Sequence, residues 1–326
     1  MCTAISVTNK NHYFGRNLDY EHTFGEKITV TPRNYKFCFR NGTEIKTHPA
    51  IIGMALPMDN YPLYFDATNE SGLSVAGLNF PDNASYMEKD DAKDNVASFE
   101  LIPWILCKCK TVSDAEKLLA NINITDESFN DKMPPSPLHW IISDKKKSIT
   151  LEQTKSGIKV YDNPVGVLTN NPSFDMQMLN LSNYLHVSPN EPENKFSDKI
   201  NLKIYSRGMG GIGLPGDLSS MSRFVRACFT KLNSVYGSTE SETVNQFFHI
   251  LYSVYQQKGC AKVGEDYEIT NYSSCCNTDT GVYYYTTYNN YTINAVDMHK
   301  ENLDSDKLVT YELLKQETIS IQNRAI

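Results

Sequence analysis

The chain has 326 residues, a formal net charge of −7, 40% hydrophobic residues and 21% charged residues. This composition is ordinary for a globular protein with a large core, and the negative charge argues against nucleic acid as a general partner. We find no apolar stretch suited to a signal peptide or a membrane span, so we expect a cytoplasmic chain without membrane insertion.

The first part of the chain reads as strands joined by polar turns, and two helices follow it. The strands are expected at 3–7, 13–18, 28–31, 63–68 and 73–79. The helices are expected at 98–109 and at 113–122, where Ser113 and Glu116 would form a capping box.

The second part repeats this order with more strands. Strands are expected at 138–143, 149–153, 157–161 and 165–169, before helices at 220–235 and 242–256. The last strands are expected at 267–273, 282–288, 292–298, 308–311 and 319–322. Blocks of strands separated by helix pairs do not form a βαβ alternation, so they indicate two packed antiparallel sheets with helices outside. No linker or repeat divides the sequence, and we expect one domain over 1–326.

The second residue is the most informative one. Met1 precedes a small residue and is readily removed, so Cys2 would then carry both a thiol and a free α-amine. That amine has an ordinary pKa of about 7.7 to 8.0 and can act as a base beside the nucleophile. If Met1 stays attached, the amine is blocked. Met-Cys by itself is a common beginning without functional meaning.

The other seven cysteines show no spacing, alone or with the histidines, that suits zinc. A disulfide framework is not expected in a chain of this kind, and most of these cysteines are interpreted as small buried apolar residues.

Arg16 and Asp19 lie on the strand that pairs through a short hairpin with the strand beginning at Cys2. Arg16 could favour the Cys2 thiolate, and Asp19 could hold the protonated α-amine. A regular strand directs residues three apart to opposite faces, so both roles require a bend or bulge near Leu18. Otherwise the two residues form a surface pair of little energetic weight.

Asn79 and Asn170 each stand at the end of an apolar strand. An asparagine there usually satisfies a turn, but side-chain amides at strand ends also suit an oxyanion hole.

Three other patterns are interpreted as structural. Residues 208–213 match GxGxxG, but Leu214 and Pro215 follow where a dinucleotide-binding helix should begin, so we expect a tight loop. Ser74 lies in a sequence that lacks the last glycine of GxSxG. His139 has no partner at a useful spacing and is interpreted as a hydrogen-bonded core histidine.

Taken together, these residues resemble the choloylglycine hydrolase family of N-terminal-nucleophile hydrolases, and most of all its bacterial bile salt hydrolases. The resemblance covers essentially the whole chain. It rests on the segments Met1-Cys2-Thr3, Phe14-Gly15-Arg16-Asn17-Leu18-Asp19, Asn69-Glu70-Ser71-Gly72-Leu73, Ala76-Gly77-Leu78-Asn79-Phe80-Pro81, Pro137-Leu138-His139-Trp140, Gly166-Val167-Leu168-Thr169-Asn170, Gly213-Leu214-Pro215-Gly216-Asp217, Ser222-Arg223-Phe224 and Glu301-Asn302-Leu303.

The resemblance implies an α+β fold, a four-layer αββα sandwich, and a homotetramer whose 187–213 loop reaches a neighbouring subunit. It implies hydrolysis of the amide of glycine- or taurine-conjugated bile salts through a thioester, without metal or cofactor. It also implies the site residues. The catalytic set would be Cys2, Arg16, Asp19, Asn79, Asn170 and Arg223, and the substrate would contact Arg16, Leu18, Asn79, Phe129 and Met133.

Two alternatives stay open. The first is a penicillin V acylase on the same scaffold. Within the family that this chain resembles, penicillin V acylases tend to carry Tyr at the place of Asn79, whereas bile salt hydrolases carry Asn. The second is a non-catalytic bile-acid-binding protein, in which the Cys2 thiol would be dispensable.

Overall fold

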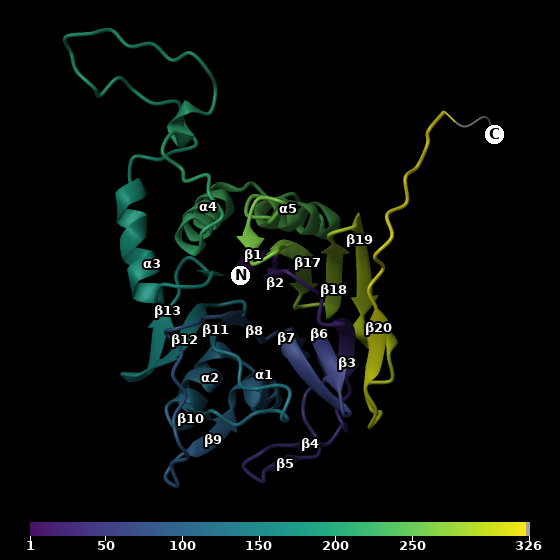
Figure 1. The fold of residues 1–326 in the computed structure, drawn as a ribbon. Helices are drawn as coiled ribbons and strands as arrows, with labels where there is room; N and C mark the ends of the chain where they lie inside the picture. The colour runs from purple at the N-terminus through teal and green to yellow at the C-terminus, as the bar shows by residue number, and fades with distance from the viewer. Residues whose placement is uncertain (324–326) are drawn as a thin grey trace.

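The structure, a computed structural model, describes residues 1–323 as two antiparallel sheets packed face to face with helices outside them (Figure 1). The helices α4 (Ser220–Asn233) and α5 (Glu240–Tyr252) cover the first sheet. The helices α1 (Leu101–Lys108) and α2 (Val112–Leu119) cover the second sheet. The expected α+β class and the αββα layer order are therefore confirmed.

The first sheet has six strands in the order β14-β1-β2-β17-β18-β19. Its strands are β1 (Cys2–Asn9), β2 (Asn11–Tyr20), β14 (Val167–Leu168), β17 (Ile269–Asn277), β18 (Val282–Thr287) and β19 (Asn290–Asp297).

The second sheet has eight strands in the order β13-β12-β11-β8-β7-β6-β3-β20. Its strands are β3 (Lys27–Thr31), β6 (Ile51–Met58), β7 (Tyr61–Asn69), β8 (Ser74–Asn79), β11 (Leu138–Ser143), β12 (Ser148–Thr154), β13 (Gly157–Asp162) and β20 (Val309–Glu312).

Shorter elements complete the chain. They are β4 (Phe37–Cys38), β5 (Glu44–Ile45), β9 (Asp94–Ala97), β10 (Ile122–Thr125), β15 (Lys262–Val263), β16 (Asp266–Tyr267), α3 (Phe174–Leu181) and the 3₁₀ helices Ser98–Glu100, Ser182–Tyr184, Met209–Gly211 and Met298–Lys300. Between α3 and α4 the chain forms a long loop that projects away from the sandwich (Figure 1).

The strand that carries Cys2 lies in the middle of these layers. All residues from Cys2 to Val7 are buried, because β1 has the second sheet on one face and α4 and α5 on the other. A strand covered on both faces reads as a nearly continuous apolar run, which is the pattern Ala4-Ile5-Ser6-Val7 shows. This burial holds the beginning of β1 in one position.

Several expected elements differ from the structure. The capping box at the second helix uses Thr111 and Asp114 instead of Ser113 and Glu116, and the helix ends at Leu119. Ile122, the last residue expected in that helix, instead begins β10, which pairs in parallel with β9. The helix expected to begin at Glu242 begins at Glu240, because Thr239 and Glu242 form its capping box. The strand expected at 319–322 is absent from the described residues.

The sequence reading also missed β6 and α3. In β6, Gly53 interrupts the apolar run and weakens the strand pattern. The structure explains this glycine, because an added Cβ there would lie 2.1 Å from the Asp66 carbonyl oxygen on the neighbouring strand.

Candidate active site

The Cys2 side chain lies at the beginning of β1 and lines a cavity of about 260 Å³. Cys2 pairs with Leu18 across the β1–β2 hairpin, and its thiol is free and 4% exposed. Met1 precedes it in the structure, so the Cys2 nitrogen is here a peptide nitrogen. The hairpin therefore brings the thiol to the cavity together with residues of β2.

All the residues expected to contact a substrate line this same cavity. They are Arg16, Leu18, Asn79, Phe129 and Met133. The sequence reading missed most of the remaining wall, which is largely apolar: Tyr20, Phe24, Leu56, Leu63, Tyr64, Phe65, Phe99, Pro134, Pro135, Pro137 and Leu138. The apolar and aromatic run from Leu63 to Phe65 on β7 was a usable signal, because all three of its residues line the cavity.

Asn170 contacts the nitrogen of Cys2 directly. The Cys2 N–H donates to Asn170 Oδ1 at 2.8 Å, and Asn170 Nδ2 donates to the Asn79 carbonyl oxygen at 2.7 Å. Asn170 thus joins the end of the β14 segment to β1 and β8. One of the two N–H groups of Nδ2 donates to that carbonyl, and Oδ1 faces the nitrogen that becomes the α-amine once Met1 is lost.

Arg223 supports this arrangement from α4, the helix that covers the outer face of the first sheet. Its Nη1 donates to the Cys2 carbonyl oxygen and, at 2.7 Å, to Thr3 Oγ1, while Nη2 donates to Asn170 Oδ1 at 2.8 Å. Its Nε donates to the Leu218 carbonyl oxygen at 2.9 Å. The guanidinium is fully buried, so these bonds replace its lost hydration and fix the orientation of Asn170.

Arg16 reaches from β2 toward the second sheet. Its Nη1 donates to the carbonyl oxygens of Phe65 at 3.0 Å and Gly77 at 2.6 Å. Its Nη2 has no hydrogen-bond partner among residues 1–323, and the side chain lines the cavity. Burial alone would lower the pKa of Arg16, but nearby acidic groups, Cys2 first among them, raise it, so the guanidinium stays charged. A charged, under-bonded guanidinium can donate to an anionic or carbonyl ligand in the cavity.

Asp19 is fully buried near the amino terminus. Its Oδ1 accepts from Thr270 Oγ1 at 2.6 Å, while Oδ2 lies 4.0 Å from Arg223 Nη1 and accepts no hydrogen bond from the described residues. Burial raises the pKa of Asp19, against the opposing effect of Arg223 and of the terminal amine. The carboxylate therefore has one oxygen available to a nearby amine.

Arg16 and Asp19 can act at one site only if the strand pairing is irregular near Leu18, because a regular strand directs residues three apart to opposite faces. The register between β2 and β17 shifts between Thr270 and Tyr272, which are opposite Asp19 and Leu18. Both side chains are buried, and the charge of each acts on the terminal amine. A surface Arg–Asp pair is thereby excluded.

Three buried acidic or hydroxyl groups near this site were missed from sequence. Glu268 forms an ion pair with the Met1 ammonium group. Thr270 donates to Asp19, as described above. Asp66 on β7 accepts from the hydroxyls of Tyr272 at 2.8 Å and Tyr283 at 2.6 Å. Their partners lie about two hundred or more residues away in sequence, so local patterns could not reveal them.

The residues interpreted as structural are structural here. His139 is fully buried, with Nε2 2.8 Å from the Thr169 carbonyl oxygen and its ring stacked on Phe80 at 4.2 Å between centroids. Ser74 is buried and shares a hydrogen bond of 2.8 Å with Thr68. The glycine-rich segment forms the 3₁₀ turn Met209–Gly211 in the projecting loop and opens no α-helix.

Residues 1–323 contain no group of three or more His, Cys, Asp or Glu side chains arranged to hold a metal ion. Within the same residues, no helix has both the length and the apolar character needed to cross a bilayer.

Two antiparallel sheets between helical layers, with a cysteine opening a central strand at a cavity, define the class of N-terminal-nucleophile hydrolases. Sequence comparison gives the family: residues 2–311 match the linear amide C–N hydrolases of the choloylglycine hydrolase family. The chain belongs to this family.

Individual relatives agree. The chain is 54% identical to a bile salt hydrolase/transferase from Lactiplantibacillus plantarum, over 96% of this chain and 97% of that one. It is 40% identical to a bile salt hydrolase/transferase from Clostridium perfringens, over 99% of each chain.

Solved structures give the same picture. A mutant of the conjugated bile acid hydrolase from Clostridium perfringens superposes with a TM-score of 0.91 at 39% identity, over 99% of this chain and 100% of that one. A penicillin V acylase from Agrobacterium tumefaciens has a TM-score of 0.76 at 18% identity, over 96% and 91% of the two chains. That second likeness concerns the fold alone.

Proposed function

We propose that this protein hydrolyses the amide bond joining glycine or taurine to a bile acid, with Cys2 as nucleophile. The observation that carries the proposal is the cavity of Cys2, whose wall is largely apolar and which is also lined by the under-bonded Arg16 guanidinium. A conjugated bile salt has matching parts, a rigid apolar steroid and a polar amide at one end. Relatives named as bile salt hydrolases support the same substrate.

The reaction begins after loss of Met1, which frees the α-amine of Cys2. An α-amine has an ordinary pKa of about 7.7 to 8.0, so near neutral pH it can take the thiol proton. Asn170 Oδ1, already 2.8 Å from this nitrogen, orients the amine. Asp19 Oδ2 stabilises it once it is protonated. Arg16 favours the thiolate by its charge.

The thiolate then attacks the amide carbonyl carbon and forms a tetrahedral oxyanion. The Asn79 side chain lines the cavity and is one proposed donor to that oxyanion. The second is the N–H of Asn170 Nδ2 that is not donated to the Asn79 carbonyl oxygen. The ammonium of Cys2 gives its proton to the departing amine, which leaves as glycine or taurine. Water next attacks the thioester, releases the bile acid and restores the thiol. No step uses a metal or a cofactor.

We further propose a homotetramer in a reducing, cytoplasmic setting. The projecting loop exposes large apolar side chains that a monomer would leave in water: Leu185, Phe196, Leu202, Tyr205 and Ile212. All eight cysteines are free, as expected of a reducing compartment. Light scattering on the full chain tests the assembly, and a variant with the loop residues Phe196 and Tyr205 changed to Ser should dissociate.

The test of the activity is amino-acid release from glycocholate and taurocholate beside cleavage of penicillin V, with intact mass showing that Met1 is gone. Glycine or taurine release that disappears in Cys2→Ala is expected. Penicillin V cleavage alone would move the protein to the acylase branch. If a chain beginning at Cys2 shows neither activity but still binds bile salts, the protein is a binding protein instead.

A further inference from the structure

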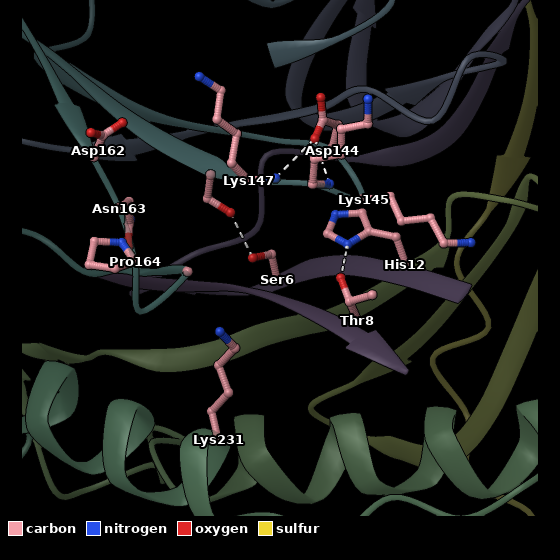
Figure 2. A pocket seen from close by; sticks show the side chains of 13 residues that line it. Ser6, Thr8, His12, Asp144, Lys145, Lys147, Asp162, Asn163, Pro164 and Lys231 are labelled. Carbon is pink, nitrogen blue, oxygen red and sulfur yellow. Dashed lines mark hydrogen bonds between the residues drawn. The ribbon is translucent and has the colours of Figure 1, made fainter. Parts of the chain in front are cut away.

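A second cavity, of about 520 Å³, lies outside the Cys2 site between β1, the β11–β12 turn and α4 (Figure 2). Most of its lining residues carry polar or charged side chains, and we call it the lysine cleft. The lining residues are Ser6, Thr8, His12, Asp144, Lys145, Lys146, Lys147, Ser148, Asp162, Asn163, Pro164, Gly166 and Lys231. None of these residues lines the Cys2 cavity.

Lys231 is the unusual residue of the lysine cleft. It rises from α4 toward Ser6 and Pro164 (Figure 2), and its Nζ donates to the Val165 carbonyl oxygen. No carboxylate of residues 1–323 forms an ion pair with it, and burial lowers the pKa of Lys231 to about 8. It therefore still carries its charge near neutral pH. A partly buried cation without a counter-ion loses hydration that no opposite charge replaces, and an anion in the cleft would compensate for that loss.

The other charges of the cleft leave room for an anion. Lys145 pairs with Asp279 at 2.6 Å and Lys147 with Glu116 at 2.6 Å, so Lys146 and Lys231 are the lining cations without an ion pair in the described chain. Of the two lining aspartates, Asp144 accepts from the backbone N–H groups of Val112, Lys146 and Lys147, which hold its carboxylate in the turn. Asp162 is an exposed residue at the rim.

A chain of hydrogen bonds ends in the same cleft. It runs from Thr8 Oγ1 to His12 Nδ1 at 3.0 Å and from His12 Nε2 to Ser143 Oγ at 3.1 Å. It continues to Ser148 Oγ at 2.8 Å and ends at Ser6 Oγ after 2.9 Å. Burial lowers the pKa of His12 to about 4, so the ring is neutral and has one N–H.

Counting the hydrogens of this chain gives a spare donor. Three serines, one threonine and one imidazole supply five polar hydrogens, and the four hydrogen bonds use four of them. With the ring proton on Nε2 of His12, every bond runs toward Ser6, and the Ser6 hydroxyl hydrogen is free. With the proton on Nδ1, the free hydrogen is that of Thr8. Either end of the chain opens into the cleft.

Gly166 shapes the space between Ser6 and Lys231. An added Cβ there would lie 2.4 Å from Ser6 Oγ and 2.8 Å from Lys231 Nζ. The backbone of Gly166 is also in the left-handed region, with φ of +55°. The ammonium and the hydroxyl therefore converge on a small volume that any other residue would fill.

We propose that the lysine cleft is a binding site for a small oxyanion, such as phosphate or sulfate, held by the Lys231 ammonium, the Ser6 hydroxyl and the Lys146 side chain. Ser6 lies four residues along β1 from Cys2, roughly 13 Å at the usual rise of a strand. Lys231 lies on the helix that carries Arg223. The bound anion joins β1 to α4, the two elements that Arg223 joins beside the nucleophile, and it stabilises their packing without entering the reaction.

The experiment is thermal unfolding of the full chain in sodium phosphate, sodium sulfate and sodium chloride at equal ionic strength. Binding to the folded state raises the melting temperature with ligand concentration. Phosphate and sulfate should raise it well above chloride. The apparent Kd for phosphate should weaken at least tenfold in Lys231→Met and severalfold in Ser6→Ala. Lys307→Met, a change of an exposed lysine outside the cleft, should respond as the unchanged protein does.

Equal responses to phosphate and chloride, or an unchanged phosphate response in Lys231→Met, would overturn the proposal. Bile salt hydrolysis by Lys231→Met serves as the check that this variant folds. Should it not fold, a crystal of the unchanged protein soaked in selenate decides the matter. An anomalous peak beside Lys231 Nζ is expected, and an empty cleft at saturating selenate would refute the site.

Discussion

Asn170 Oδ1 accepts the N–H of Cys2 at 2.8 Å, so the side chain at the end of one strand fixes the nitrogen that begins another. Arg223 donates to the same oxygen at 2.8 Å and to the Cys2 carbonyl oxygen. The nucleophile's backbone is thereby held on both sides of its Cα before any substrate is present. Such preorganisation is what lowers a barrier, because no reorganisation remains for the transition state.

Asn170→Ala should lower kcat by roughly 10² to 10³ with a small change in KM, the size of effect seen for a lost preorganised contact. Steady-state kinetics with glycocholate measure both constants. Asn171→Ala is the matched control, since the Asn171 amide donates at the surface to the Pro81 carbonyl oxygen. Equal losses in both variants would show that the site does not depend on the Cys2–Asn170 contact.

Arg16→Lys should lower kcat/KM by about 100-fold despite keeping the charge. A lysine ammonium is a point donor and cannot bond the Phe65 and Gly77 carbonyls while also presenting a nitrogen to the cavity. Circular dichroism and the melting temperature check the fold. A Lys variant with nearly full activity would mean that charge alone is required.

A chain that keeps residues before Cys2 should be inactive. In the structure the Met1 ammonium is bound by Glu268 and the Asp19 carbonyl oxygen, and the Cys2 nitrogen is a peptide nitrogen with no basic lone pair. An uncleavable N-terminal extension, verified by intact mass, should reduce the rate at least a thousandfold, about 4 kcal/mol in the barrier. The same extension placed after the last residue is the control. Activity with the extension in place would remove the α-amine from the mechanism.

Asp66→Asn should weaken catalysis without touching the substrate. Asp66 accepts from Tyr272, Tyr283 and Ser274, and Ser274 Oγ accepts the backbone N–H of Arg16 at 3.1 Å. The negative charge of Asp66 also compensates the buried positive charge of Arg16. We expect kcat/KM to fall about tenfold and the melting temperature to drop, as after removal of one partner of a buried charge pair. Tyr283→Phe, which removes one bond and no charge, should have the smaller effect. The reverse order would contradict a role through Arg16.

His12→Gln should make the unfolding free energy less dependent on pH between pH 6.5 and 4. Burial lowers the pKa of His12 to about 4, below its unfolded value near 6.5, so between these values the unfolded chain binds the extra proton. The unfolding free energy therefore decreases as pH falls from 6.5 to 4, by at most about 3 kcal/mol for this group. Urea unfolding at pH 7 and pH 4.5 measures it. An unchanged difference between the two pH values in His12→Gln would contradict this assignment.

The sequence alone was sufficient for the layer order, because strand patterns are local. The catalytic residues were named from the family resemblance and stay predictions. The position of Arg16 on the strand that pairs with β1 was accessible, since a tight turn fixes the register of a hairpin, in which Cys2 lies opposite Leu18. The helix boundaries at Thr111 and Thr239 were missed by a few residues, although the capping threonine was present in each case. The strand β10 was missed because its parallel partner β9 lies about thirty residues earlier and gives no local signal.

The tertiary structure decided what each residue faces. Asn170 was expected as an amide donor, and the structure adds that its acceptor oxygen accepts the N–H of Cys2. Glu268 and Thr270 enter the site only because β17 pairs with β2, and Asp66 because Tyr272 of β17 and Tyr283 of β18 donate to it. These contacts join residues about two hundred or more positions apart. The lysine cleft likewise forms where β1, the β11–β12 turn and α4 meet. Periodicity follows from the backbone of one segment, whereas burial, charge compensation and spare hydrogen bonds depend on segments that only folding brings together.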